Sequence, residues 1–121
     1  MRLFSHTRFP KECPRSAAIR ALADQWPDEK SRKLIRERAI HDKEEGPRIV
    51  AIRALAEKWP DDDTRKLIEE RAVKDPGKGP RSAAIRALAE NWPDQNARKL
   101  IEERAVHESP ADDPKNGGDG S

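Results

Sequence analysis

Apolar residues recur along the chain at the spacing of one helical face. A first group stands at relative positions zero, one, four, five and eight: Ala18, Ile19, Leu22, Ala23 and Trp26. At about 100° per residue, such positions form a single stripe on a helix. The pattern predicts a helix over residues 15–25. Its other side is polar and carries Ser16, Arg20 and Asp24.

The segment Trp26-Pro27-Asp28 predicts the end of this helix and the start of another. A residue that precedes proline is pushed out of the helical region. Asp28 can then cap the next helix, because its carboxylate accepts hydrogen bonds from unpaired N–H groups at the helix start. We expect a second helix over residues 29–41, with a stripe formed by Leu34, Ile35 and Ala39.

This two-helix pattern occurs three times without a gap. Residues at equivalent places are 33 positions apart, as in Pro14, Pro47 and Pro80. The units span residues 14–46, 47–79 and 80–108. One helical hairpin is too small to bury its own stripes, whereas three stacked hairpins share a continuous core. The sequence therefore predicts an all-α fold, a short α-solenoid of three 33-residue helix-turn-helix repeats.

The central unit is more apolar than its neighbours. Ile49 and Val50 stand where the outer units have Ser-Ala. A central repeat is covered on both sides, so this difference agrees with stacking. Each unit begins with a proline, which suits the first position of a helix.

The two ends of the chain differ from the repeats. Residues 1–13 form a non-repeat N-terminal segment, and residues 109–121 are rich in Pro, Asp and Gly. The latter composition predicts a disordered acidic tail. Neither end shows a polar capping repeat, so we expect exposed apolar end faces that cause either self-association or marginal stability.

Two recurring residues inside the stripes are assigned structural roles. The first is the tryptophan, expected in the core: Trp26, Trp59 and Trp92. The second is an arginine of the second helix: Arg38, Arg71 and Arg104. Its stem is expected to pack while its guanidinium bonds helix carbonyls or a neighbouring carboxylate. Stacking on nucleic-acid bases, for tryptophan, and anion binding, for arginine, are the alternatives.

Stacking would also align basic residues on the outer surfaces. The first helices carry Arg20, Arg53 and Arg86, and the second helices carry Arg32, Lys33, Arg65, Lys66, Arg98 and Lys99. These are the candidate binding residues. Columns of this kind can follow a phosphate backbone. However, acids alternate with the bases at helical spacing, which mainly supports helices and solubility.

Composition narrows the function further. The chain has 121 residues with 40% charged residues and a net charge of only +2. It has no apolar run near the about 18 residues that a membrane span needs, and no apolar run at its start. We therefore expect a soluble, cytoplasmic protein without membrane contact.

Candidate chemistry is sparse. The chain has one cysteine, Cys13, and three histidines that form no cluster with metal-ligand spacing. The segment Gly77-Lys78-Gly79-Pro80 lacks the spacing of a phosphate-binding Walker A loop. We expect no metal, no cofactor and no enzymatic activity.

The motif Pro-Arg-x-x-Ala-Ile-Arg-Ala-Leu-Ala resembles the HEAT repeat family, with Arg15, Ala18 and Leu22 at characteristic places of the first helix. The Trp-Pro-Asp turn with Arg-Lys-Leu-Ile-x-Glu-Arg-Ala is similar to repeats in C-terminal arrays of bacterial NACHT-type signalling ATPases. The resemblance covers about residues 14–108. It implies a curved α-solenoid that binds macromolecules, here as a sensor-like fragment without an ATPase module.

These observations predict a non-catalytic scaffold that binds another protein. Nucleic-acid binding through the Arg/Lys columns is the alternative, and an enzyme of the HEAT-like pigment-lyase kind is a third possibility supported by fold analogy alone. The sequence names neither the partner nor the face that binds it, nor whether the chain is complete, a fragment or designed.

Overall fold

The computed structural model describes residues 13–107, and all regular structure in this range is α-helical. The helices are α1 (Pro14–Gln25), α2 (Glu29–His41), α3 (Glu45–Lys58), α4 (Asp62–Lys74), α5 (Lys78–Asn91) and α6 (Gln95–Val106). They form three consecutive helical hairpins, as predicted. The expected N-terminal segment lies outside the described residues except for Cys13, and the expected disordered tail lies entirely outside them.

Each Trp-Pro-Asp turn is built in the same way. The Trp26 N–H donates to the Leu22 carbonyl at 2.9 Å, which ends α1, and the Asp28 N–H donates to the Trp26 carbonyl at 2.7 Å. The Asp28 carboxylate then accepts from the Ser31 N–H at 2.9 Å and caps α2. Asp61 and Asp94 cap α4 and α6 in the same way. The predicted capping role of aspartate is confirmed.

The start of the first helix was predicted wrongly for the second and third units. In α1 the proline is the first residue, but α3 and α5 begin two residues earlier, so that Pro47 and Pro80 stand third. Proline is tolerated there because the first four N–H groups of a helix have no partner within it. The extra residues include Gly79, where an added Cβ would lie 2.8 Å from the Ile49 Cδ1 atom of α3. Glycine thus permits this close approach of the two helices.

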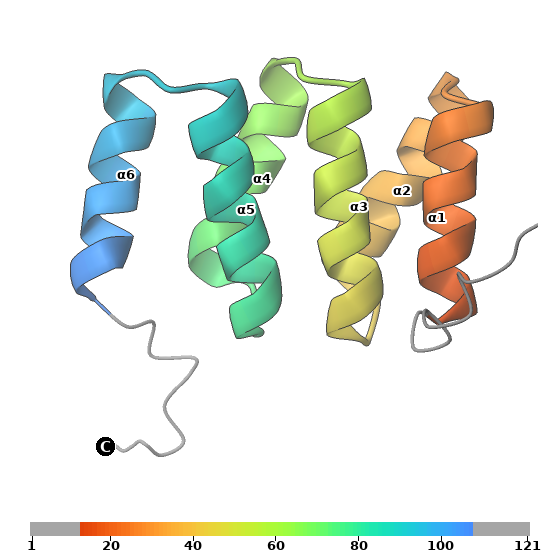
Figure 1. Cartoon of the computed structure of the whole chain (residues 1–121), viewed down its shortest axis with the longest axis horizontal. Coiled ribbons are helices and arrows are strands. Elements are labelled where there is room, and N and C mark those ends of the chain that lie inside the picture. The colour runs from red at the N-terminus through yellow and green to blue at the C-terminus, as the bar shows by residue number, and fades with distance from the viewer. Residues whose placement is uncertain (1–12, 108–121) are drawn as a thin grey trace, which may run out of the picture.

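The helices form two layers. Helices α1, α3 and α5 stand side by side, with α2 and α4 behind them and α6 at the C-terminal end (Figure 1). In addition to its neighbours in the row, α3 packs mainly against α2, and α5 against α4. In the first and second hairpins, the second helix therefore contacts the next hairpin more than its own partner helix. This interlocking makes the array continuous.

The core runs through both layers and is most complete in the central unit. Helix α3 buries seven residues, whereas α1 buries three, which confirms that a central repeat buries more. The centre of the core consists of Ala51, Ile52 and Leu55 of α3 and of Ile68 and Ala72 of α4, which are all fully buried.

Three expectations for the first unit need correction. Trp26 is 59% exposed, whereas Trp59 and Trp92 are half-buried against the core. Leu34 is 44% exposed, whereas its counterpart Leu67 is buried. Both exposures have the same cause, because no repeat precedes the first one in the described structure. Ser16, expected on the polar side of the first helix, is instead buried at the start of α1.

A buried ion pair between Arg48 and Asp75 links the two helices of the central unit. The same arginine also forms a hydrogen bond to the preceding unit. Arg48 of α3 donates from Nε and Nη2 to the two carboxylate oxygens of Asp75, each at 3.1 Å. Its third nitrogen, Nη1, donates to the Asp42 carbonyl of the first unit at 2.7 Å. Arg48 is 7% exposed in its side chain and Asp75 is fully buried. This arginine thus pairs within its own repeat and also ties that repeat to its neighbour.

Candidate protein-interaction surface

The outer side of α1, α3 and α5 carries two parallel rows of charge. The first row consists of the exposed arginines Arg20, Arg53 and Arg86, and the second consists of the exposed acids Asp24, Glu57 and Glu90. Within each helix the acid follows the arginine by four residues, which places both on one face. We call this face the odd-helix surface. The stacking of the repeats brings its six charged residues together from three separate segments.

Two grooves run between the helices of this surface. The groove between α1 and α3 has a volume of about 240 Å³, and the groove between α3 and α5 about 490 Å³. Alanines line both grooves, and the two charge rows border them. The larger groove is lined by Arg53, Ala56, Glu57, Ala83, Arg86, Ala87, Glu90 and Asn91. The small side chains leave room for side chains of a bound molecule.

The odd-helix surface is charge-balanced. Its three arginines are matched by three acids, and Lys58 of α3 lies 3.6 Å from the Asp24 carboxylate of α1. A surface with both signs of charge has no strong net potential of either sign. Its chemistry suits a partner with complementary charges of both signs.

The predicted arginines of the second helices have a different environment. Arg32 of α2 donates to Asp61 of α4 at 2.8 Å, and Arg65 of α4 donates from Nη1 and Nη2 to the carboxylate of Asp94 at 2.7 and 2.8 Å. Each aspartate is also the cap of its helix, so each arginine binds the helix start of the next repeat. These two arginines thus join neighbouring repeats, in addition to the buried Arg48 contacts.

The electrostatics of this contact agree with its geometry. The Arg65 guanidinium and the Ala97 N–H hold the pKa of Asp94 at about 2. The two carboxylates of Asp94 and Glu69 in turn raise the pKa of Arg65. The Thr64 N–H and Arg32 likewise lower the pKa of Asp61. Both aspartates are therefore ionised at neutral pH.

The other basic residues predicted on the second helices are either exposed or partly buried. Lys33, Lys66 and Lys99 are exposed on the second helices, and so is Arg98. Arg38 and Arg71 lie 3.4 and 3.5 Å from the carboxylate of a buried aspartate four residues later. Arg104 is half-buried. The residue four positions after it, at position 108, lies outside the described residues.

The arginine after the proline of the first two units makes contacts that were not predicted from the sequence. Arg15 donates to Asp42 at 3.0 and 3.2 Å, in the same arrangement as Arg48 and Asp75. Burial alone would raise the pKa of Asp42, but the bonds from Arg15 and from the Glu44 N–H outweigh it and lower the pKa. The signal was present in the sequence as an arginine and an aspartate 27 residues apart in two successive units.

Cys13 takes part in capping. Its Sγ atom accepts from the Ser16 N–H at 3.4 Å and lies 3.3 Å from the Ser16 Oγ atom. The bonds with Ser16 lower the pKa of the thiol. Among residues 13–107, no group of three or more His, Cys, Asp or Glu side chains is arranged to hold a metal ion. No helix in this range is long and apolar enough to cross a membrane.

The described fold defines a class of protein, an array of stacked helical hairpins with interlocked neighbours. A family model of HEAT repeats matches residues 10–89, which is more than half of the chain. The chain belongs to the HEAT repeat family. HEAT repeats generally serve as protein-interaction scaffolds and are typically non-catalytic. No curated protein and no solved structure matches the chain.

Proposed function

We propose that this chain is a scaffold that binds another protein through the odd-helix surface. One observation carries the proposal: an arginine and, four residues later, an acid stand exposed in all three repeats and border two alanine-lined grooves. Arginine is enriched among residues that dominate binding energy at interfaces. Packing of the helices does not require these rows of charge, because their side chains are exposed outside the packed layers.

The partner is a protein rather than a nucleic acid. A phosphate backbone is bound by clustered positive charge, whereas here an acid stands one helical turn from every arginine of the odd-helix surface. The second helices offer fewer available bases than the sequence suggested, since Arg32 and Arg65 are engaged with Asp61 and Asp94. A protein surface with charges of both signs fits the observed rows better.

The resemblance of the Trp-Pro-Asp repeats to the arrays of NACHT-type signalling proteins supports a narrower role. In that role the scaffold acts as a sensor-like element, and the partner that occupies the odd-helix surface is the signal. The proposal adds no catalytic step, and it relies on the same six charged residues.

Affinity capture from the source lysate, with and without nuclease, tests the proposal. The wild-type chain is compared with a variant that carries Arg53→Glu and Arg86→Glu on the odd-helix surface. Both residues are exposed, so the fold should be retained, as judged by far-UV circular dichroism. We expect a defined protein that the wild type retains after nuclease treatment and that this variant loses.

A matched control carries Lys66→Glu and Lys99→Glu on the second helices. It has the same change in net charge and also alters exposed residues, but it leaves the odd-helix surface intact. The control should capture the partner as well as the wild type does. Equal loss in both variants would contradict the assignment of the surface, and loss of all captured material upon nuclease treatment would favour nucleic acid.

A further inference from the structure

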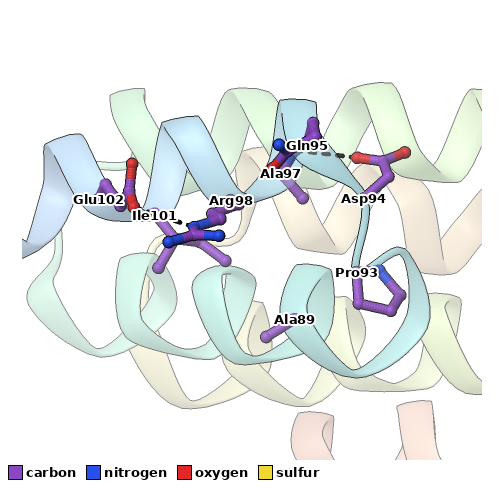
Figure 2. A pocket seen from close by; sticks show the side chains of 8 residues that line it. All are labelled: Ala89, Pro93, Asp94, Gln95, Ala97, Arg98, Ile101 and Glu102. Carbon is purple, nitrogen blue, oxygen red and sulfur yellow. Dashed lines mark hydrogen bonds and ion pairs between the residues drawn. The ribbon is translucent and has the colours of Figure 1, made fainter.

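The last repeat has an open groove on its C-terminal side. In the preceding repeat, the next repeat covers the equivalent surface. This groove lies between α5 and α6 and has a volume of about 670 Å³. Ala89 of α5 faces Ile101 and Arg98 of α6 across it (Figure 2). In the central unit the equivalent residues Ala56 and Ile68 are buried beneath the third repeat. The groove is therefore the place that a further repeat would occupy.

The N-terminal end of the array exposes the opposite half of the same contact. Ala18 is exposed in α1, whereas its counterparts Ala51 in α3 and Ala84 in α5 are fully buried. Leu34 and Trp26 are exposed at this end as well. The surface that packs on a preceding repeat is thus present and uncovered among the described residues.

The charged residues at the two ends of the array are also complementary to each other. Inside the array, an arginine of one repeat binds the helix-capping aspartate of the next, as in Arg32–Asp61 and Arg65–Asp94. At the C-terminal end, the contact that Arg98 makes within residues 13–107 is the one to Glu102, which is equivalent to Arg65–Glu69. The Arg98 side chain is 71% exposed, against 19% for Arg65. At the N-terminal end, Asp28 caps α2 and is exposed. One end presents the arginine, and the other presents the aspartate.

We infer that the chain binds a second copy of itself head to tail, with Arg98 of one copy paired to Asp28 of the next. The first repeat of the second copy sits on α5 and α6 as the third repeat sits on α3 and α4. Such a contact joins two different surfaces, so it continues to further copies instead of closing as a symmetric dimer. This inference is independent of the proposed function, because it uses the ends of the array and not the odd-helix surface.

Sedimentation velocity of the wild-type chain from micromolar to millimolar concentration provides the first measurement. We expect the average mass to rise steadily with concentration. A chain that remains monomeric over the whole range would overturn the inference, whatever segment or partner then covers the end faces.

Two blocking variants test the head-to-tail geometry. Ala18→Glu places a charge on the N-terminal end face, and Ala89→Glu places one on the C-terminal end face. Each variant alone should be monomeric, and an equimolar mixture should form a one-to-one dimer and nothing larger, because one free end of each kind remains. A variant that still dimerises alone would show a symmetric contact and overturn the inference. Circular dichroism confirms that both variants are folded.

A charge variant with a neighbouring control tests the proposed ion pair. Arg98→Glu should weaken self-association by about tenfold or more, since it removes a charge pair and sets like charges against each other. Lys99→Glu changes the net charge equally but should have little effect, because the counterpart Lys66 stays exposed although the third repeat covers the second. Equal weakening by both substitutions would refute the Arg98–Asp28 contact.

Discussion

The arginine that follows each unit's proline offers the sharpest test of how the repeats hold together. Arg48→Ala removes both hydrogen bonds to the fully buried Asp75 and the bond to the Asp42 carbonyl. Asp75 keeps the Gly77 N–H at 2.9 Å and the more distant Arg71 at 3.5 Å. Breaking a buried ion pair by removing one partner costs about 3–5 kcal/mol. This is a large share of the roughly 5–15 kcal/mol that stabilises a typical domain.

The first repeat supplies a matched control. Arg15→Ala is the same substitution at the same repeat position, but the Arg15 side chain is 43% exposed. The Asp42 carboxylate is buried, but water reaches the Arg15 end of this pair, and ion pairs open to water contribute about 0–1 kcal/mol. Asp42 also retains the Glu44 N–H and Arg38 as partners. We therefore expect Arg15→Ala to lower the free energy of unfolding by about 1 kcal/mol or less.

Urea unfolding followed by circular dichroism measures both losses by linear extrapolation. If Arg48→Ala is unfolded in buffer, an osmolyte such as sucrose restores the folded state and permits the comparison in the same solvent. A loss for Arg48→Ala below about 1 kcal/mol, or equal losses for the two variants, would refute the reasoning that burial makes this pair essential.

Three further predictions follow from burial and charge. Leu67→Ala should lower the free energy of unfolding by about 2–5 kcal/mol and Leu34→Ala by less than about 1, because the first side chain is 6% exposed and the second 44%; equal losses in urea titrations would contradict this. The pKa of Asp94 lies at about 2, below its ordinary value of 3.8, so its ionised form stabilises the fold above about pH 4 and this contribution is lost as the pH falls through about 2. The stability difference between wild type and Asp94→Asn should therefore shrink over that pH range, and a constant difference in pH-dependent thermal melts would disagree. Ala51→Leu should cost about 1–3 kcal/mol by overpacking the contact between α1 and α3, while Ala18→Leu should change stability by about 0.5 kcal/mol or less; calorimetry on dilute samples distinguishes them.

The hairpins were predictable from the sequence because three local signals agree. The apolar spacing, the Trp-Pro break and the aspartate cap all mark the same boundaries, and the 33-residue interval repeats them. The starts of α3 and α5 were missed because Gly46 and Gly79, which stand directly before the prolines, are poor helix formers. Packing of their N-terminal turns against the preceding helix overrides that propensity.

The roles of the basic residues were harder to predict. Arg32 and Arg20 look alike in the sequence, since each is an arginine with an acid four or five residues away. Only the stacking shows that Arg32 reaches the cap of the next repeat while Arg20 borders a groove. Position within one helix does not reveal this difference, because both contacts come from other repeats.

The exposure of side chains at the ends of the array could not be predicted from residue type either. Trp26 and Trp59 occupy the same repeat position, yet the first is exposed and the second half-buried. The preceding repeat decides the difference. Sequence patterns describe a typical repeat, whereas burial depends on the place of that repeat in the array.

The most direct test of the proposed function is the affinity of a captured partner for three forms of the chain. Isothermal titration calorimetry should give a dissociation constant for Arg53→Glu/Arg86→Glu at least about tenfold weaker than for the wild type, equivalent to about 1.4 kcal/mol. The control Lys66→Glu/Lys99→Glu should bind within about threefold of the wild type, about 0.7 kcal/mol. If the odd-helix variant binds as tightly as the wild type, or if the control is weakened equally, the odd-helix surface is not the binding site.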